Sequence, residues 1–340
     1  MSGRLFPFPP VLYNYPFHPG QLGVPGSADF NLERVGETEA KALYVDASHT
    51  AANDNNDGLN PDRPLKTIQA AVNKVTARGD IIYVAPAFYT EAVVTPNDTT
   101  GPEDVAIVGT GPTDVFPVWL PVVATSPCLF VRAAGWKVSN FLFSVPRSQA
   151  AIVLATGAVG ISSADDDASG AIVQHCIFDG SSTLAGSIGI DLLGAPEGVR
   201  IEDNYFSCIG GTTGTAIACT AITALGKEPA SPIIKDNVFV NGTVFIDIPA
   251  KDAIITGNVL MMSANGISPT TYIDLRGYTN DKTCTYSGGG VIYMNVFDGT
   301  YSNAGGYYAN TTHSNFWSGN LIRPAVAAAT TQPWTSIPPA

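Results

Sequence analysis

Three acidic residues next to a repeated, Asn-containing segment are the candidates for acid–base chemistry. Asp203 and Asp236 each directly precede an Asn of that segment, and Glu202 directly precedes Asp203. Hydrolysis of a sugar linkage needs two carboxylates about 5–10 Å apart, one acting as the acid and the other as base or nucleophile. If the repeats stack, Asp203 and Asp236 lie on neighbouring repeats. The alternative is that these acids are polar turn residues at an exposed corner.

Two further polar segments were considered as metal sites. "NDNNDG" places Asn53, Asn55 and Asp57 in alternation before a glycine, as a calcium loop does. The Glu that completes such a loop is missing, because Pro64 stands at its position. "SSADDDASG" offers the acids 165–167, a run that also suits a solvated loop tip. We therefore expect no bound metal and no cofactor.

Aromatic side chains within the repeats are candidates for stacking on sugar rings, because an aromatic face packs well against the apolar face of a sugar. Binding of a glycan, with or without cleavage, would use such residues in a surface groove. The candidates are Trp136, Tyr205, Tyr293 and Trp317.

The composition favours an all-β protein with a weakly charged surface. Charged residues make up 14% of the chain, against about 25% in an average globular protein, and 34 Gly with 25 Pro indicate many turns. The formal net charge of −12 disfavours binding to nucleic acid or to anionic membranes. The five cysteines show no C-x-x-C spacing. We therefore expect buried, reduced cysteines in a protein made in a reducing cytosol.

From about residue 105 the chain repeats a short pattern. Segments such as "VRIEDNYFSC", "PIIKDNVFVNG" and "GVIYMNVFDGT" share a β-branched pair, one or two polar residues, an apolar pair and a small turn. Repeats of strands and turns without alternating helices predict a solenoid, and here a parallel β-helix. We expect the recurring Asn to adopt a left-handed conformation at a corner and to form a ladder between coils. Its slot holds Asn140, Cys176, Asn204, Asn237, Asn258, Asn295 and Asn320. A β-sandwich is the alternative fold.

The segment before the repeats is expected to close the solenoid. In "LKTIQAAVNKVTARG" the apolar residues recur with helical spacing, which predicts an amphipathic helix over residues 65–78 that plugs the N-terminal end. The predicted boundaries are an extended arm at 1–41, an N-terminal cap with strand, helix and first coil at 42–104, the β-helix at 105–323, and a tail at 324–340.

The cap segment resembles a known family. "NDGLNPDRPLKTIQAAVNKVTARGDIIYVAPAFYTEAVV" is similar to the opening of right-handed parallel β-helix proteins of the pectate-lyase-like superfamily, with its Pro-(Phe/Leu)-x-Thr-Ile helix, Gly-Asp-x-Ile-x-Val strand and Gly-x-Tyr-x-Glu turn. Ala87 replaces the usual Gly of that turn. The resemblance implies the fold. It does not select one activity, since the superfamily includes polysaccharide lyases, glycosidases, phage tailspikes and virion proteins without known activity.

The first 21 residues alternate aromatic and proline residues, which excludes a helix or a central strand. Prolines and polar residues also interrupt any run long enough for an export signal or a membrane span. We expect this arm to bind a neighbouring capsid or tail protein, although it could also wrap over its own β-helix. The partner-binding candidates are Phe6, Phe8, Tyr13, Tyr15 and Phe17.

These features lead to one preferred function and two alternatives. The preferred function is a structural bacteriophage virion protein, a capsid decoration or tail-associated β-helix anchored through its arm and forming a homotrimer by analogy. Binding of host glycans is an additional option for such a protein. The alternatives are a tailspike-like polysaccharide lyase or glycoside hydrolase, and a glycan-binding protein that does not cleave. The path of the C-terminal tail is left open.

Overall fold

Residues Glu39–Ala340 form one compact unit in the computed structural model. The structure describes residues 40–111, 115–123, 126–145, 150–157, 163–180, 188–207, 215–218, 229–240, 244–248, 252–261, 271–274, 290–299, 308–309, 316–324 and 335–336. The arm residues Phe6, Phe8, Tyr13, Tyr15 and Phe17 lie outside these ranges, so their predicted role stays a prediction.

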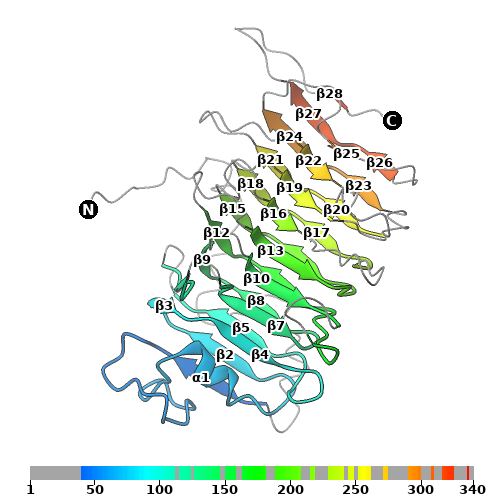
Figure 1. Cartoon of the computed structure of the whole chain (residues 1–340). Coiled ribbons are helices and arrows are strands. Elements are labelled where there is room, and N and C mark those ends of the chain that lie inside the picture. The colour runs from blue at the N-terminus through cyan, green and yellow to red at the C-terminus, as the bar shows by residue number, and fades with distance from the viewer. Residues whose placement is uncertain are drawn as a thin grey trace. The chain divides into compact units, whose positions relative to one another are not determined.

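Three sheets, here called A, B and C, run along the unit (Figure 1). Sheet A contains β1 (Ala42–Val45), β2 (Ile81–Val84), β5 (Ala106–Gly109), β8 (Lys137–Ser139), β11 (Ile172–Gln174), β14 (Arg200–Glu202), β17 (Ile233–Lys235), β20 (Ile254–Thr256), β23 (Val291–Tyr293) and β26 (Phe316–Ser318). Sheet B contains β3 (Phe88–Thr90), β6 (Val118–Leu120), β9 (Leu142–Ser144), β12 (Ile177–Asp179), β15 (Tyr205–Ser207), β18 (Val238–Val240), β21 (Val259–Met261), β24 (Val296–Gly299), β27 (Leu321–Pro324) and β28 (Thr335–Ser336). Sheet C contains β4 (Val93–Asn97), β7 (Leu129–Arg132), β10 (Ala150–Ala155), β13 (Ile188–Leu193), β16 (Thr215–Ala218), β19 (Val244–Asp247), β22 (Thr271–Asp274) and β25 (Tyr308–Ala309).

The chain visits sheets A, B and C in turn, so that each coil adds one strand to every sheet. Every strand pair between successive coils is parallel; among the described strands only β27 and β28 pair in the antiparallel direction. This arrangement confirms the predicted parallel β-helix and excludes the β-sandwich, whose sheets are antiparallel.

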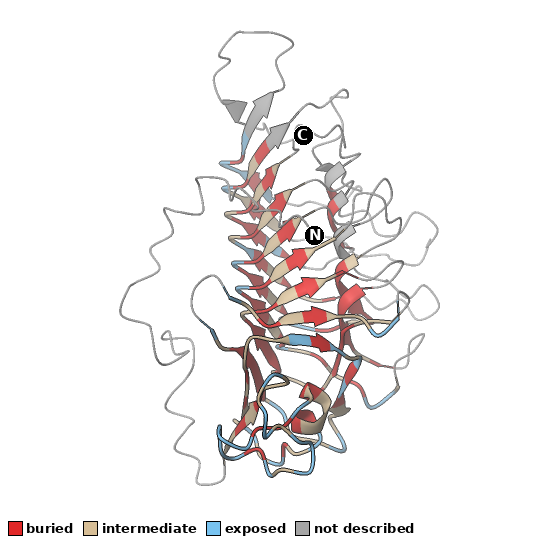
Figure 2. Cartoon of the chain, turned by 90° about the vertical axis from the view of Figure 1, so that its left-hand side faces the viewer, coloured by how far each residue is buried: buried red, intermediate tan, exposed pale blue. Residues whose placement is uncertain are grey.

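The core is a set of side-chain columns between the three sheets, because inward positions of successive strands lie in register. On sheet A this column is β-branched, with Val173, Ile201, Ile234, Ile255 and Ile292 all fully buried. On sheet B it is aromatic: the rings of Phe178 and Phe206 stack at 4.6 Å and those of Phe206 and Phe239 at 4.9 Å. Figure 2 shows the buried positions repeating from coil to coil. Burial of identical side chains on each coil is what holds the stack together.

Sheets A and B meet at a two-residue corner, and the two positions of this corner have different structural roles. The second position carries the ladder: the amide of Asn204 donates to the Asn237 carboxamide oxygen at 3.0 Å and to the Val173 carbonyl at 2.9 Å. The same pattern continues through Asn258 and Asn295. It ends at Asn320, whose amide donates to the Ile292 carbonyl. All five ladder residues are buried.

The first corner position carries the left-handed backbone, which corrects the prediction that the ladder Asn adopts it. Positive φ angles occur at Asn140 (63°), His175 (53°), Asp203 (54°), Asp236 (55°) and Met294 (55°), and at no ladder residue. Asn140 therefore belongs to this first position and not to the ladder. Strand pairing agrees, since Ser139 faces Gln174 and Leu142 faces Ile177, which aligns Asn140 with His175.

The N-terminal end is closed by a shorter helix than the sequence predicted. Helix α1 spans only Ile68–Val72, with turns after it, although the apolar residues of the predicted 65–78 helix are all buried. Thr67 caps the helix by accepting from the Ala70 backbone N–H, and the Glu91 carboxylate accepts from the N–H groups of Ile68 and Gln69. The preceding loop covers the free edge of β1 through a Leu65 to Tyr44 backbone bond of 2.8 Å. The expected plug is thus made by loop and helix together.

The tail returns to the last coil at the C-terminal end. Strand β28 pairs antiparallel with β27, placing Thr335 opposite Ile322 and Ser336 opposite Leu321. The question that the sequence left open is therefore answered for these two residues, which extend sheet B by one strand.

Cys128 and Cys176 are buried free thiols, as expected for a reduced protein. Burial raises the pKa of each to about 12, so both thiols stay protonated and unreactive at neutral pH. In the described ranges there is no helix of the length and apolarity that crossing a bilayer requires.

Candidate functional site

The longest chain connections lead into and out of the strands of sheet C. From β8 onward the turn between sheets A and B has only two residues, as between Glu202 and Tyr205. The connections into and out of sheet C are longer: Ser207 precedes β16 at Thr215, and Ala218 precedes β17 at Ile233. Loops that vary in length on a constant scaffold are where binding and catalysis concentrate. Sheet C is therefore the face on which to look for a site.

Three aspartates occupy one register position on sheet C. Asp191 of β13 pairs with Ala218 of β16, Ala218 with Asp247 of β19, and Asp247 with Asp274 of β22. We call Asp191, Asp247 and Asp274 the aspartate column. Because neighbouring strands lie ~4.8 Å apart, Asp247 and Asp274 are about one strand spacing apart and Asp191 and Asp247 about two.

Asp191 and Asp247 lie on the strand face opposite the core. The residues just before the aspartates of the column, Ile190, Ile246 and Ile273, are fully buried in the main core. Successive residues of a strand point to opposite faces, so the next position belongs to the outer face. Asp191 also pairs with Val153, which belongs to a separate apolar cluster outside the core. Asp191 is 9% exposed, and Asp247 is half-buried.

An apolar platform adjoins the aspartate column on the earlier coils of the same outer face. It consists of Phe130, Ala150, Val153, Ala155 and Leu193, all buried, with Ile188 packed against them. Its members are at most 6% exposed, so the platform offers a ligand little apolar surface. The outer face of sheet C thus places carboxylates next to a buried apolar cluster.

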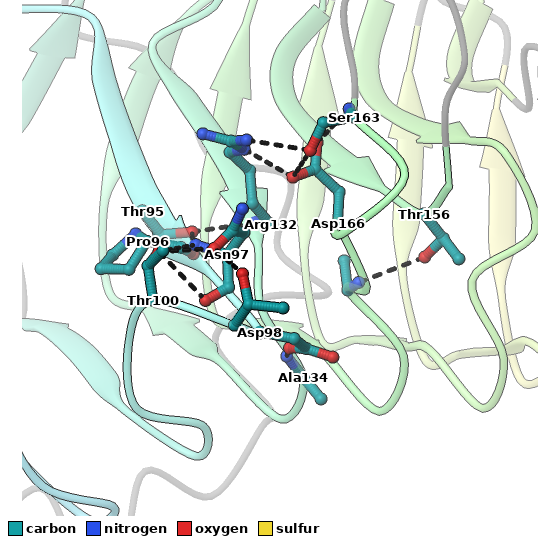
Figure 3. A network of polar contacts seen from close by, with 12 residues as sticks. Thr95, Pro96, Asn97, Asp98, Thr100, Arg132, Ala134, Thr156, Ser163 and Asp166 are labelled. Carbon is teal, nitrogen blue, oxygen red and sulfur yellow. Dashed lines mark hydrogen bonds and ion pairs between the residues drawn. The ribbon is translucent and has the colours of Figure 1, made fainter.

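A polar network fixes the connection that leaves the earlier coils of sheet C (Figure 3). The Arg132 guanidinium at the end of β7 donates to the Asp166 carboxylate at 2.7 Å and to the Ser163 hydroxyl at 3.2 Å. Asp166 is fully buried as a side chain and also accepts from the Ser163 backbone N–H. The prediction of a solvated tip for residues 165–167 is therefore wrong for Asp166. Its charge is neutralised by Arg132, and the pair anchors the loop.

Asp98 lies beside this network and accepts from the Ala134 N–H at 3.0 Å. Burial raises the pKa of its carboxyl, and the nearby acids Asp167, Glu103 and Asp166 raise it further. This group organises backbone at the edge of sheet C and is not aligned with the aspartate column.

The acids predicted from the sequence lie at the A–B corner. Asp203 and Asp236 are on neighbouring coils, as expected: the Asp203 N–H donates to the Lys235 carbonyl at 3.1 Å. Glu202 accepts from the Arg200 guanidinium on its own strand at 2.8 Å. Burial raises the pKa of Asp203; His175, 3.8 Å from it, lowers that pKa, and Asp236 raises it. The left-handed backbone explains Asp at these two positions, because Asn and Asp tolerate it better than other side chains.

Two of the four predicted stacking residues are inaccessible. Trp136 is fully buried and its indole N–H donates to the Pro102 carbonyl at 3.1 Å, and Trp317 is 6% exposed within the core. Their burial means that neither can stack on a glycan. Tyr205 and Tyr293 are half-buried on outer faces, but of sheets B and A respectively. The four residues do not form one groove.

The possible calcium loop is a series of turns. The Asn53 side chain accepts from the Asn55 N–H at 2.9 Å, and the Asp57 carboxylate accepts from the Leu59 N–H at 3.0 Å. Within the part of the chain that the structure describes, no group of three His, Cys, Asp or Glu side chains could hold a metal ion.

A shallow pocket of about 640 Å³ lies near the N-terminal end of the coil stack. Val75, Thr76, Arg78 and residues 99–103 line it. Arg78 forms an ion pair with Asp104 beside it. None of the lining residues belongs to sheet C's aspartate column, so the pocket does not extend that site.

Comparison with known proteins places the fold. No protein-family model matches the sequence, and no curated protein matches it in sequence. An alginate lyase from a Paenibacillus species superimposes with a TM-score of 0.50 at 11% identity, over 82% of this chain and 95% of that one. The chain is a right-handed parallel β-helix.

Two other β-helix proteins show a weaker likeness. A lacto-N-biosidase from Eubacterium ramulus matches with a TM-score of 0.47 at 13% identity, over 86% of this chain and 61% of that one, so this chain spans less than two thirds of it. A pectate lyase matches with a TM-score of 0.46 at 10% identity, over 88% and 80% of the two chains. At these identities the likeness concerns the fold.

Proposed function

We propose that this β-helix binds a neutral polysaccharide across the outer face of sheet C and hydrolyses its glycosidic linkages with the aspartate column. The observation that carries the proposal is the register that aligns the Asp191, Asp247 and Asp274 positions on sheet C.

The spacing of the aspartate column fits hydrolysis by two carboxylates. One protonated carboxyl gives its proton to the glycosidic oxygen as the bond to the anomeric carbon breaks. The second carboxylate either attacks that carbon or takes a proton from the water that attacks it. Carboxyl separations of about 5 Å serve the first route and about 6.5–9.5 Å the second. Asp247 takes part in both possible pairs, with Asp274 at one strand spacing and with Asp191 at two.

The charge of the chain favours a neutral substrate. The protein carries a formal net charge of −12, which includes the carboxylates of the site. A uronic acid polymer would meet repulsion there unless a divalent cation bridged the two charges. A neutral glycan meets no such barrier.

The decisive experiment compares Asp247→Asn with Asp236→Asn on a panel of neutral and uronic polysaccharides. We expect Asp247→Asn to lower reducing-end release from a neutral glycan by about 10²–10⁴-fold, the usual loss when an acid–base group is removed. Asp236→Asn is the matched control, because it makes the same change at the A–B corner and should keep full activity.

Each outcome of this experiment has a separate meaning. Loss in Asp236→Asn alone would move the site to the A–B corner, and full activity of both variants would exclude both Asp247 and Asp236 as acid–base groups. Unsaturated products that appear only with added calcium would show that the protein cleaves by elimination and not by hydrolysis. Binding to a glycan without cleavage by the wild-type protein would contradict the hydrolase and support a non-cleaving glycan-binding protein.

A further inference from the structure

The pocket near the N-terminal end of the coil stack is built from two separate parts of the chain. One wall is the segment that follows α1, with Val75, Thr76 and Arg78. The other wall is residues 99–103, in the connection from β4 to β5. The pocket volume of about 640 Å³ lies within the ~300–1,000 Å³ typical of small-molecule sites. The pocket is therefore large enough for a ligand of small-molecule size.

Hydrogen bonds to the rest of the fold hold both walls in place. The fully buried Asp80 carboxylate accepts from the backbone N–H groups of Thr76 and Ala77, at 2.8 and 3.1 Å. On the other wall, the Pro102 carbonyl accepts from the indole N–H of the buried Trp136 at 3.1 Å. A site that is formed before its ligand arrives loses less freedom when the ligand binds. Both walls of this pocket meet that condition.

The charged groups of the lining disfavour a charged ligand. Arg78 forms an ion pair with Asp104, the residue that follows Glu103. An anion in the pocket would lie next to the Glu103 carboxylate, and a cation next to the Arg78 guanidinium. The apolar part of the lining is small, because Val75 is 7% exposed and Pro102 is the other apolar residue. The class of ligand that fits this lining is neutral and polar.

The hydroxyl groups of the lining narrow this class further. The hydroxyls of Thr99 and Thr100 donate to the Asn97 side chain, so their oxygens can accept from a ligand. The Thr76 hydroxyl accepts from the Lys41 ammonium at 2.8 Å and keeps its own hydrogen to donate. A sugar hydroxyl both donates and accepts, so adjacent hydroxyls of one sugar can use both kinds of group. Their bonds to a carboxylate or a guanidinium are strengthened by the charge.

We propose that this pocket binds a neutral sugar unit, separately from the aspartate column on sheet C. The lining residues belong to the segment after α1 and to the β4–β5 connection, and none of them is a strand residue of sheet C. The proposal does not depend on the hydrolase, because a sugar can bind here whether or not sheet C cleaves one. A second point of attachment would also raise the avidity for a glycan that reaches both places.

The test is saturation-transfer NMR on the full chain with glucose and galactose, each compared with its own uronate. We expect transfer to at least one neutral sugar, with a dissociation constant on the order of 1 mM for so small a ligand. The matching uronate should bind about 5-fold more weakly, because its carboxylate lies near that of Glu103.

Two variants locate the bound sugar, each with a matched control. Thr99→Trp fills the pocket from an exposed position and should abolish transfer, whereas Thr90→Trp makes the same change at an exposed position of β3 and should not. Glu103→Gln covers the case in which the Trp variant misfolds. It should weaken binding about 10-fold by removing a charged acceptor. Glu197→Gln, in the connection after β13, should bind as the wild type does.

The remaining outcomes separate this pocket from sheet C. Asp247→Asn should bind the sugar with wild-type affinity even where cleavage of a glycan is lost. Sugar binding that disappears in Asp247→Asn, or that persists in both Thr99→Trp and Glu103→Gln, would overturn the proposal. No transfer to either neutral sugar at about 50 mM would overturn it as well. A uronate that binds as tightly as its neutral sugar would contradict the predicted ligand class.

Discussion

At the scale of single residues, the A–B corner separates two roles that look alike in the sequence. The side chain of each buried ladder Asn donates and accepts hydrogen bonds between coils. The residue before it must only adopt a left-handed backbone conformation. His175, Asp203, Asp236 and Met294 differ in chemistry but share that backbone. The chemical variety at this position indicates a conformational demand and not a catalytic one.

Replacement of a ladder Asn should therefore be costly. Asn237→Ala removes the acceptor for the Asn204 N–H and side-chain amide, and the donor to the Ile201 carbonyl. We expect a loss of about 3 kcal/mol in the free energy of unfolding, because buried polar groups lose their partners. Chemical denaturation measures it. The neighbouring Asp236→Asn should change stability by less than about 0.5 kcal/mol, and a similar loss in both variants would contradict the separation of roles.

The aspartate column was not predicted from the sequence, although the sequence contains a signal for it. "GIDLL", "FIDIP" and "YIDLR" each place an Asp between an aliphatic pair, at residues 191, 247 and 274. A search for acids next to the recurring Asn could not find them, because they belong to a different sheet. Aligning all strands of each coil, and not only the most regular ones, would have shown the register.

At the scale of elements, the strands of sheets A and B could be predicted from the sequence, whereas the strands of sheet C could not. Strands of sheets A and B flank a two-residue turn of constant length, so their pattern repeats in the sequence. Sheet C lies between connections of varying length, which hide its period. The prediction of Asn140 as a ladder residue is wrong for a related reason. Phe141 occupies the ladder position of that coil, and Asn140 is the residue directly before it.

The short helix α1 shows how a neighbouring element can replace helix length. Glu91, in the connection after β3, accepts two N–H groups at the start of α1, and its own carbonyl accepts from the Trp119 indole at 3.0 Å. Glu91→Ala leaves both N–H groups without this acceptor. We expect about 2 kcal/mol of destabilisation, measured by denaturation, with Glu91→Gln intermediate because one acceptor oxygen remains.

The Glu91 carboxyl also predicts a pH dependence. Burial raises its pKa above the ordinary value, although its bonds to Gln69 and Ile68 oppose the shift. A carboxyl with a raised pKa binds its proton more tightly in the folded state, so its contribution to stability falls as pH rises through that pKa. Relative to Glu91→Gln, the wild type should gain melting temperature as the pH is lowered from about 7 toward about 4. A constant difference over this range would contradict the raised pKa.

At the scale of the whole molecule, the fold predicted from the cap segment is confirmed, while the virion role stays a prediction. That role depends on the arm at residues 1–41, nearly all of which lies outside the described ranges. The predicted homotrimer likewise stays a prediction.

Deletion of residues 2–20 tests the arm independently of the β-helix. We expect the truncated chain to keep its melting temperature, since the core columns begin at β1, and to lose attachment to a virion or other partner assembly. Co-sedimentation with purified particles measures attachment, and glycan cleavage by the same sample serves as a control for folding. Full attachment of the truncated chain would remove the arm from this role.

The antiparallel strand β28 has a consequence for how the coil stack can grow. The strands at the two ends of a stack of parallel coils have unpaired backbone groups, so the last strand of one molecule can pair with the first strand of another. At the C-terminal end, β28 pairs antiparallel with β27 on sheet B. At the N-terminal end, the loop at Leu65 covers the edge of β1. Both contacts occupy backbone groups that another molecule would otherwise pair with. Head-to-tail addition of molecules through sheet B and through the edge of β1 is thereby disfavoured.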